Sequence, residues 1–249
     1  MIGHCPITLR AEDHTYWHEN GEQYASVTKL RKSIQKPFAE KEIARSVATS
    51  QLRKEGKSYT DSELLIRTME IIGIWKKSGE DAMAQGSYID KQIETYFLTG
   101  GVVDSKLTEL LEGLWRLMEN YKTKKVKTYV WSDEHKVAGE IDINCMRRSK
   151  NICDYYDTKV KVSKGIQYIS KNNDYMLAPL EHLENCSYND YAMQLSIYGM
   201  LGELCYKVKP GKMTLIEINP LENYRYKLIP VPYMKYEAWA LLENWRVKQ

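Results

Sequence analysis

The stretch VAGEIDINCMRRSKNICDYYDTKV, residues 137–160, places charged side chains in two segments that otherwise read as buried strands. Glu140 and Asp142 lie two residues apart in the first segment, and Asp157 and Lys159 lie two residues apart in the second. Residues two apart in a strand share a face of the sheet. If the two strands pair around the RRSK turn, Asp142 and Asp157 are expected to converge.

Converging carboxylates indicate a particular chemistry, because two of them held close together repel unless a cation lies between them. Oxygen ligands with no His or Cys nearby suit Mg²⁺ or Mn²⁺ rather than zinc. Such a metal lowers the pKa of bound water and offsets charge on a phosphate oxygen. A lysine two residues beyond the acid can orient that water. The alternative is a hairpin with ordinary surface charges, because Asp-x-Lys alone occurs by chance in many strands.

A helix predicted over residues 78–97 supplies two further acids. Ser78 and Asp81 have the spacing of a capping box, and Asp90 and Glu94 lie four residues apart on one side of the helix. Apolar residues at helical spacing define its expected buried stripe. The stripe consists of Ala82, Gly86, Ile89, Ile93 and Phe97.

The segments around these residues suggest one α/β domain. Asn20-Gly21 is a hairpin turn signal, Thr28 is expected to cap a short basic helix, and residues 38–57 read as a basic helix with either a solvated face or phosphate contacts. The remaining expected elements are a helix over 105–122, an antiparallel meander of strands over 125–131, 135–146 and 151–160, an irregular stretch over 161–186, a helix over 187–206 opened by a capping box of Ser187 and Asp190, strands over 213–219 and 224–231, and a helix over 233–247.

Composition sets limits on the class of protein. The hydrophobic fraction of 43% supports a core, and the net charge of +3 is too small to indicate nucleic-acid binding by itself. Five cysteines with no C-x-x-C pair argue against a zinc ribbon and a disulfide framework. No apolar run reaches the length of a membrane span, and the N-terminus lacks the apolar core of a signal peptide. We therefore expect a cytoplasmic protein without membrane partners.

Taken together, the motifs resemble the RecB-like branch of the PD-(D/E)xK nuclease superfamily, including phage-type exonucleases and the mitochondrial genome maintenance exonuclease. GEID at 139–142 matches the family's G-x-x-D strand, and DTK at 157–159 matches its (D/E)-x-K strand. QLSIY at 194–198 matches the Q-x-x-x-Y helix, and GSYIDKQIE at 86–94 resembles the G-T/S-x-x-H-x-x-I-E helix. YASVTKL at 24–30 resembles the S-V-T segment that opens several members.

The resemblance implies a restriction-endonuclease-like αβββαβ core, with a central mixed sheet flanked by helices and with extra N-terminal helices. It implies a single nuclease domain over 1–249, in which 1–77 form a hairpin and helical extension and 78–249 form the catalytic core. It also implies Mg²⁺ or Mn²⁺ as cofactor, and DNA, as a single strand or a duplex end, as the partner. Phage recombination or replication proteins would be further partners, and the location would be the host cytoplasm for a phage-encoded chain.

The resemblance also assigns roles to individual residues. Asp142 and Asp157 would bind the metal, helped by the carbonyl of Thr158, and Lys159 would position or activate the attacking water. Asp90 would complete the metal shell. Gln194 and Tyr198 would steady the site and the nucleic-acid backbone, the alternative being a satisfied polar pair on a buried helix. Two weaker candidates complete the set, namely Glu94, which could equally pair with a lysine, and Glu140, which could equally face solvent.

Two departures from the family pattern affect what is expected. Asp90 stands where the family has a metal-binding histidine, and Val160 stands where the family has threonine after the lysine. An alternative register would use Asp154 as the acid, but no lysine follows it two residues later. Some relatives bind an iron–sulfur cluster through four spaced cysteines, and the scattered cysteines here predict none.

The expected activity is a metal-dependent DNA exonuclease acting in phage DNA recombination, repair or processing. One rival is a structure-specific endonuclease of the same superfamily. Another is a non-catalytic DNA-binding accessory protein on a decayed nuclease scaffold, which the substitution at Asp90 favours. The complete set of Asp142, Asp157 and Lys159 argues against decay.

Overall fold

The computed structural model describes residues 4–10, 12–13, 15–56, 58–101, 104–148, 151–161, 165–170 and 173–248. By contacts, the chain divides into two compact units, one of residues Met1–Gln35 with Ile89–Gln249 and one of Lys36–Tyr88. The single domain over 1–249 stays a prediction. The N-terminal hairpin, which the sequence placed in an extension, belongs to the same unit as the predicted catalytic core.

The unit of residues 36–88 is helical. It contains α2 (Glu40–Lys54) and the first part of α3 (Asp61–Thr99), and its small core consists of Ala44, Ala48, Leu64 and Ile71. The prediction of a helix start at Ser78 is wrong, because α3 runs unbroken through an exposed Ser78 and contains no proline. The capping box that opens α3 lies upstream, where the amide of Glu63 donates to the Thr60 hydroxyl and the amide of Thr60 donates to the Glu63 carboxylate.

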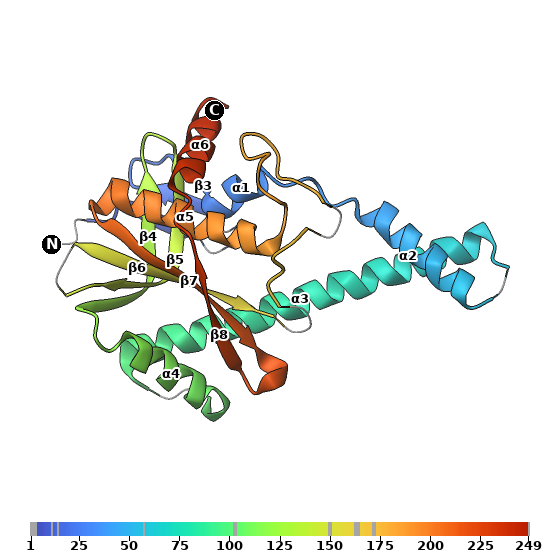
Figure 1. Ribbon diagram of the computed structural model, residues 1–249, viewed down its shortest axis with the longest axis horizontal. Coiled ribbons are helices and arrows are strands. Elements are labelled where there is room, and N and C mark those ends of the chain that lie inside the picture. The colour runs from blue at the N-terminus through green and yellow to red at the C-terminus, as the bar shows by residue number, and fades with distance from the viewer. Residues whose placement is uncertain are drawn as a thin grey trace. The chain divides into compact units, whose positions relative to one another are not determined.

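The larger unit is built around an eight-stranded mixed sheet (Figure 1). Its strands are β1 (Ile7–Arg10), β2 (Thr15–His18), β3 (Gln23–Ser26), β4 (Thr123–Ser132), β5 (Val137–Met146), β6 (Ile152–Val160), β7 (Lys209–Asn219) and β8 (Arg225–Val231). They pair in the order β1-β2-β3-β5-β6-β7-β8, with β4 also paired to β5. Among the strand pairs in the described part of the chain, β3–β5 and β6–β7 are parallel and the others are antiparallel.

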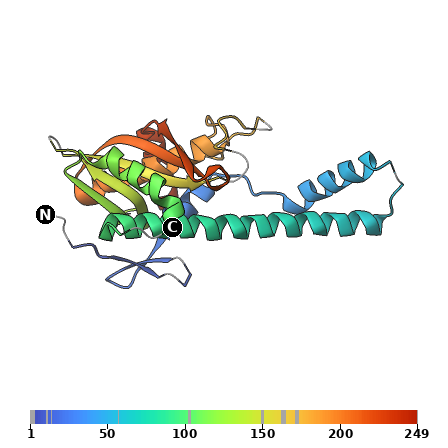
Figure 2. The ribbon, with the colours of Figure 1, turned by 90° about the horizontal axis from the view of Figure 1, so that it is seen from below.

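Helices cover both faces of this sheet (Figure 2). The helices α1 (Val27–Lys32), α5 (Ser187–Tyr206) and α6 (Lys235–Arg246) pack on one face, and α4 (Thr108–Met118) and the end of α3 pack on the other. Short 3₁₀ turns, η1 (Ser105–Leu107) and η2 (Pro220–Glu222), precede α4 and β8. The chain therefore has the αβββαβ order that the resemblance implied, in α3, β4, β5, β6, α5 and β7.

Two predicted helix caps are replaced by other contacts. The cap of α1 is Ser26, whose hydroxyl accepts from the amide of Lys29, rather than Thr28. Ser187 and Asp190 do not form a capping box, because the N-cap of α5 is Cys186. Asp190 instead accepts from Gln35 at 2.6 Å and pairs with Arg31 of the N-terminal segment. Long-range partners in the fold thus outcompete the local cap.

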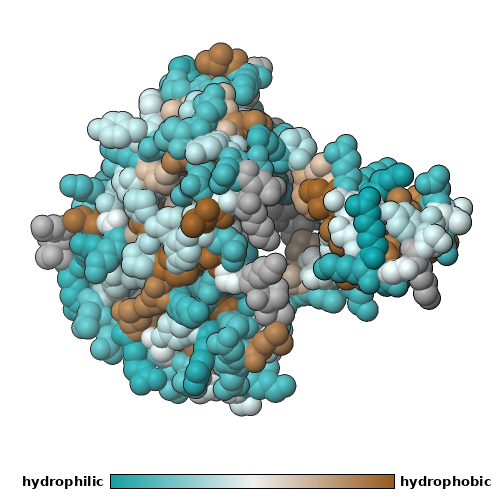
Figure 3. Space-filling model, turned by 45° about the vertical axis from the view of Figure 1, so that its right-hand side comes forward, coloured by the Kyte–Doolittle hydropathy of each residue, from teal (hydrophilic) through white to brown (hydrophobic). Residues whose placement is uncertain are grey.

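The Asn20-Gly21 hairpin, the meander β4–β5–β6 and the closing strands agree with the sequence prediction. Residues 165–170 and 173–186 contain no named helix or strand, only an isolated bridge between Tyr175 and Glu184. Ser149 and Lys150 of the predicted RRSK turn lie outside the described residues. On the face seen in Figure 3, hydrophilic residues dominate and hydrophobic ones form small separate patches.

Candidate active site

The charged residues of β5 and β6 lie where the two strands diverge. β5 and β6 pair from Met146↔Cys153 as far as Ile143↔Tyr156, after which β6 continues only along β7. On the same edge of β5, β3 pairs only with Val137 and Ala138. Residues 139–142 of β5 therefore lack a strand partner on this edge, and we call this opening, with Asp157–Lys159 opposite it, the fork.

Asp142 is held at the fork by Thr158. The amide of Thr158 donates to Asp142 Oδ2 at 2.9 Å, so a carboxylate takes the place of a backbone acceptor. The Thr158 hydroxyl lies 2.9 Å from the same oxygen and 2.7 Å from Asp90 Oδ1 on α3. The Thr158 side chain of β6 thus links an acid of β5 to an acid of α3.

Lys127 of β4 lies among the carboxylates of this cluster. Its ammonium nitrogen is 3.0 Å from Asp142, 3.5 Å from Glu140 and 3.9 Å from Asp90. The backbone of Lys127 has a φ of 51°, which is unusual for a residue other than glycine. Ile141 and Ile143 pack into different core clusters, so the regular alternation of β5 breaks at the same level. The distortion of the strands accompanies the placement of this lysine beside the acids.

Burial and neighbouring charge shift the pKa values of these acids in opposite directions. Burial, together with the nearby Asp142, raises the pKa of Asp90. Burial also opposes ionisation of Asp142, but the ammonium groups of Lys127 and Lys159 and the Thr158 amide outweigh it and lower the pKa of Asp142. The cluster therefore holds one acid that ionises readily and one that resists ionisation.

Asp157 and Lys159 form an ion pair on β6, in which Asp157 is buried and the Lys159 side chain is 16% exposed. Asp157 is only 2% exposed, and burial raises its pKa to about 6 even though Lys159 acts in the opposite direction. Burial also disfavours the charged form of Lys159, but the charges of Asp157 and Asp142 raise its pKa, so the ammonium form is kept. Removing an ion pair from water costs free energy unless further hydrogen bonds satisfy its remaining donors and acceptors.

Gln194 and Tyr198 lie on the buried middle of α5, next to the fork. The Gln194 amide donates to the Tyr198 hydroxyl at 3.1 Å, and burial raises the pKa of Tyr198 well above its ordinary value. The Tyr198 ring also packs against Gly139, where a Cβ would lie 2.6 Å from a ring carbon and 2.8 Å from Val27. A glycine at this position lets the backbone of β5 approach α5 closely.

A cationic and aromatic group surrounds Lys159 on the side of α5. The ammonium groups of Lys159 and Lys161 lie over the Tyr191 ring, at 4.8 Å and 4.9 Å from its centroid. The guanidinium of Arg31 lies 5.7 Å from the same ring and pairs with Asp190. Stacked cations of this kind suit a phosphate-bearing ligand.

The two weaker candidates have defined partners. Glu94 pairs with Lys91 at 3.1 Å, which is the alternative role that the sequence allowed for it. Glu140 is only about one-fifth exposed, with its side chain at 21%, and it contacts Lys127 rather than facing solvent. Glu140 therefore belongs to the charged cluster, whereas Glu94 pairs with a neighbour on its own helix.

The acids at the fork have the donor chemistry that suits a hard divalent cation, but no three of them bring ligand atoms within 4.8 Å of one another, a spacing that the described residues show only at Glu134, His135 and Glu243. Their potential ligands are carboxylate oxygens from three chain segments, Asp90, Asp142 and Asp157, the donor type that Mg²⁺ and Mn²⁺ prefer. Within the described residues, Asp157 Oδ2 meets only the Lys159 ammonium, and Asp157 Oδ2 and Gln194 Oε1 accept no hydrogen bond of ordinary geometry. Buried oxygens with open lone pairs require a partner, and a cation or its water shell would supply one.

Several of these residues give no signal in the sequence. Lys127 stood in a segment that reads as an ordinary strand, and nothing in its neighbours signals a positive φ. Arg31 and Tyr191 gave no signal either, because their roles depend on contacts across the fold. Asp190 was noticed, but its long-range partner was not predictable from the local pattern.

Comparisons with known proteins give little further information. No family of known proteins matches the chain, and no curated protein matches it. Among solved structures, the chain is similar to the crystal structure of a "Putative exonuclease" from Eubacterium rectale, with 14% identity and a TM-score of 0.44, over 89% of this chain and 77% of that one. At this distance the likeness carries no argument about function. Within the described ranges, no helix combines the length and apolar character needed to cross a lipid bilayer.

Proposed function

We propose that this protein is a metal-dependent deoxyribonuclease of the PD-(D/E)xK type, most similar to its RecB-like branch, and that it acts as an exonuclease. The observation that carries the proposal is the fork, where the buried Asp157 and the mostly buried Lys159 lie opposite Asp142, which Thr158 joins to Asp90. An exonuclease is preferred because the family members that the motifs resemble are exonucleases. The biological setting, phage DNA recombination, repair or processing, rests on that resemblance alone.

The reaction would be hydrolysis of a phosphodiester bond by water. When bound, Mg²⁺ or Mn²⁺ supplies positive charge at the phosphate and makes water a better nucleophile at neutral pH. Asp142 and Asp157 would hold the ion, and Asp90 and the Thr158 carbonyl would complete its surroundings. Lys159, kept as an ammonium group by Asp157, would orient the attacking water and offset the charge that develops on the phosphate.

The elements around the fork would position the substrate. Gln194 and Tyr198 form a buried hydrogen-bonded pair that would fix the α5 side of the site. Lys161 and Arg31, which share the Tyr191 ring with Lys159, would contact the phosphate backbone. These contacts carry no base information, so the expected substrate preference is for DNA structure rather than sequence.

Purified protein incubated with end-labelled linear DNA tests this proposal. In the presence of Mg²⁺ or Mn²⁺, the label is expected to be released progressively from single strands or duplex ends, while covalently closed circular DNA stays intact. Cleavage of the closed circles would instead identify an endonuclease. If all of these substrates stay intact with either ion, the protein is not a deoxyribonuclease.

A second candidate, a DNA-binding accessory protein without catalysis, is favoured by one observation. The ammonium of Lys127 already contacts the carboxylates of Asp90, Glu140 and Asp142 and offsets part of their negative charge, which reduces their need for a metal. Calorimetric titration with Mg²⁺ and Mn²⁺ separates the two candidates. A nuclease must bind at least one of these ions at the fork, and a decayed site would bind neither.

A further inference from the structure

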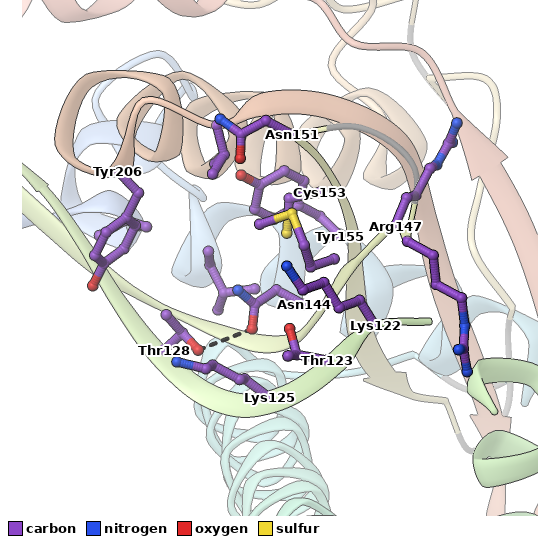
Figure 4. Close-up of a pocket in the computed structure, with 15 residues that line it drawn as sticks. Lys122, Thr123, Lys125, Thr128, Asn144, Arg147, Asn151, Cys153, Tyr155 and Tyr206 are labelled. Atoms are coloured by element: carbon purple, nitrogen blue, oxygen red, sulfur yellow. Dashed lines mark hydrogen bonds between the residues drawn. The ribbon is translucent and has the colours of Figure 1, made fainter. Parts of the chain in front are cut away.

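The larger unit contains a second site with the features of a ligand-binding pocket. A cavity of about 650 Å³ lies beside the end of α5, over one face of the strands β4, β5 and β6 (Figure 4). This volume is typical of pockets that hold small molecules. We call it the basic cavity.

The floor of the basic cavity is apolar and belongs to the core. Four of its lining residues are only 1–2% exposed, so they back the cavity as part of the packed core and offer a ligand little surface of their own. These residues are Val130, Ile141, Cys153 and Tyr155. The apolar surface that the floor offers a ligand comes mainly from the half-buried Met146, Tyr206 and Val208, so a ligand would need a flat or apolar part that can be removed from water.

The rim of the basic cavity is strongly cationic. Lys122, Lys125, Arg147 and Arg148 line it, and none of the described lining residues is acidic. Arg147 pairs with Asp154 at 2.8 Å, outside the lining. In the described parts of the chain, no ion pair holds either lysine. Positive charge without a carboxylate partner favours an anionic ligand.

Polar groups lie between the floor and the rim. The Thr128 hydroxyl donates to Asn144 Oδ1 at 2.9 Å, as the dashed line in Figure 4 shows. The Asn144 amide also hydrogen-bonds the Cys153 side chain, and its nitrogen carries two hydrogens, so one can be donated to a ligand. In Figure 4, Tyr206 and Arg147 lie on opposite sides of the cavity. The lining thus offers hydrogen bonds, an aromatic wall and cations in one enclosure.

We propose that the basic cavity binds a nucleotide, with the base on the apolar floor near Asn144 and the phosphate at Lys122 and Lys125. Inorganic phosphate would leave the floor unused, and an uncharged apolar ligand would leave the lysines unpaired. The nucleotide can be a free mononucleotide or the 5′-phosphorylated end of a DNA strand, because both present a base and a terminal phosphate. The proposal does not depend on nuclease activity at the fork.

Calorimetric titration with deoxyadenosine 5′-monophosphate, without divalent ions, tests this proposal. The nucleotide is expected to bind at one site, and deoxyadenosine without the phosphate is expected to bind at least about tenfold more weakly. The double variant Lys122→Gln, Lys125→Gln should also weaken nucleotide binding about tenfold or more. The matched control replaces two exposed lysines outside the cavity, Lys106→Gln with Lys227→Gln, and should stay within about twofold of the unmodified protein.

Two further arms complete the test. A linear 5′-phosphorylated oligonucleotide that displaces the mononucleotide, when a circular single strand of the same sequence does not, identifies a strand end as the ligand. If neither displaces it, the ligand is a free nucleotide. Asp157→Ala should leave nucleotide binding unchanged, so failure of the nuclease proposal does not affect this one. The proposal is overturned if the nucleotide does not bind, or if the cavity double variant binds it as well as the control does.

Discussion

At the scale of single residues, Lys127 is the most informative feature of the site. Its ammonium contacts the carboxylates that would hold a metal, so a divalent ion has to compete with it. The attraction between an ammonium and a carboxylate 4 Å apart is several times stronger near a protein surface than in bulk water. The lysine therefore stabilises the metal-free protein while weakening metal binding.

Replacing Lys127 with methionine should strengthen Mg²⁺ or Mn²⁺ binding by about tenfold, because a competing cation is removed while the side-chain length is kept. Calorimetric titration of the variant beside the unmodified protein measures this. Lys125→Met, on the same strand but outside the cluster of acids, should bind the ions as the unmodified protein does. Weaker binding by Lys127→Met would mean that the lysine supports the metal site instead of competing with it.

The buried Asp157 makes metal binding dependent on pH. Its pKa of about 6 lies above the ordinary value of 3.8, so the carboxyl group is increasingly protonated as the pH falls below 6. A metal must displace that proton, so affinity should rise with pH up to about 6 and then level off, and fall about tenfold per pH unit below it. Metal titrations from pH 5 to pH 8 measure this dependence. The expected slope assumes that one group titrates. A flat affinity across pH 6 would contradict the assignment of Asp157 as a ligand.

At the scale of elements, the approach of β5 to α5 depends on Gly139. A Cβ there would come within 2.8 Å of two side chains, one on α1 and one on α5. Gly139→Ala is therefore expected to lower the free energy of unfolding by about 1–3 kcal/mol, as overpacking of a core does. Urea denaturation followed by circular dichroism measures this change.

The control for this substitution is Gly73→Ala, in the middle of α3, where an added Cβ meets nothing within 4 Å. Alanine favours a helix over glycine, so this variant should be unchanged or more stable by up to about 1 kcal/mol. If Gly139→Ala were equally harmless, the contact between Gly139 and Tyr198 would not position the site.

Element types and their order were predictable from sequence to a greater extent than the contacts were. Hydrophobic periodicity and turn residues correctly gave the hairpin, the meander, α4 and α5, since these depend on local patterns. The start of α3 was missed because Ser78 and Asp81 tolerate a helix interior as well as a cap. The fork itself could not be predicted, because it results from β3 and β6 sharing one edge of β5 at a distance along the chain.

The charged residues of the site show the same difference between local patterns and long-range contacts. Asp142, Asp157 and Lys159 were predicted as site residues from their motifs, and the structure places all three at the fork, while their role stays a prediction. Lys127 and Arg31 were not identified, because electrostatic clusters form between segments that are remote in sequence. A local pattern contains no information about which remote cation will reach an acid.

At the scale of the whole molecule, the two compact units differ in how much they bury. In α5, residues 192–202 are all buried, whereas α2 buries only Ala44 and Ala48. Regions with few buried apolar contacts open more readily than the core does. Amide hydrogen exchange followed by mass spectrometry should therefore show faster exchange in α2 than in α5, and equal protection would contradict the division into units.

The central claim is that the fork hydrolyses DNA with a divalent metal, and nuclease assays on variants test it most directly. End-labelled linear DNA is incubated with Mg²⁺ and the unmodified protein, Asp157→Ala, Lys159→Ala or the exposed control Lys227→Ala. The account predicts that the unmodified protein and the control degrade the DNA, while the two fork variants lose at least about 100-fold in rate. Retention of full activity by both fork variants, or no activity in the unmodified protein with Mg²⁺ or Mn²⁺, would contradict it.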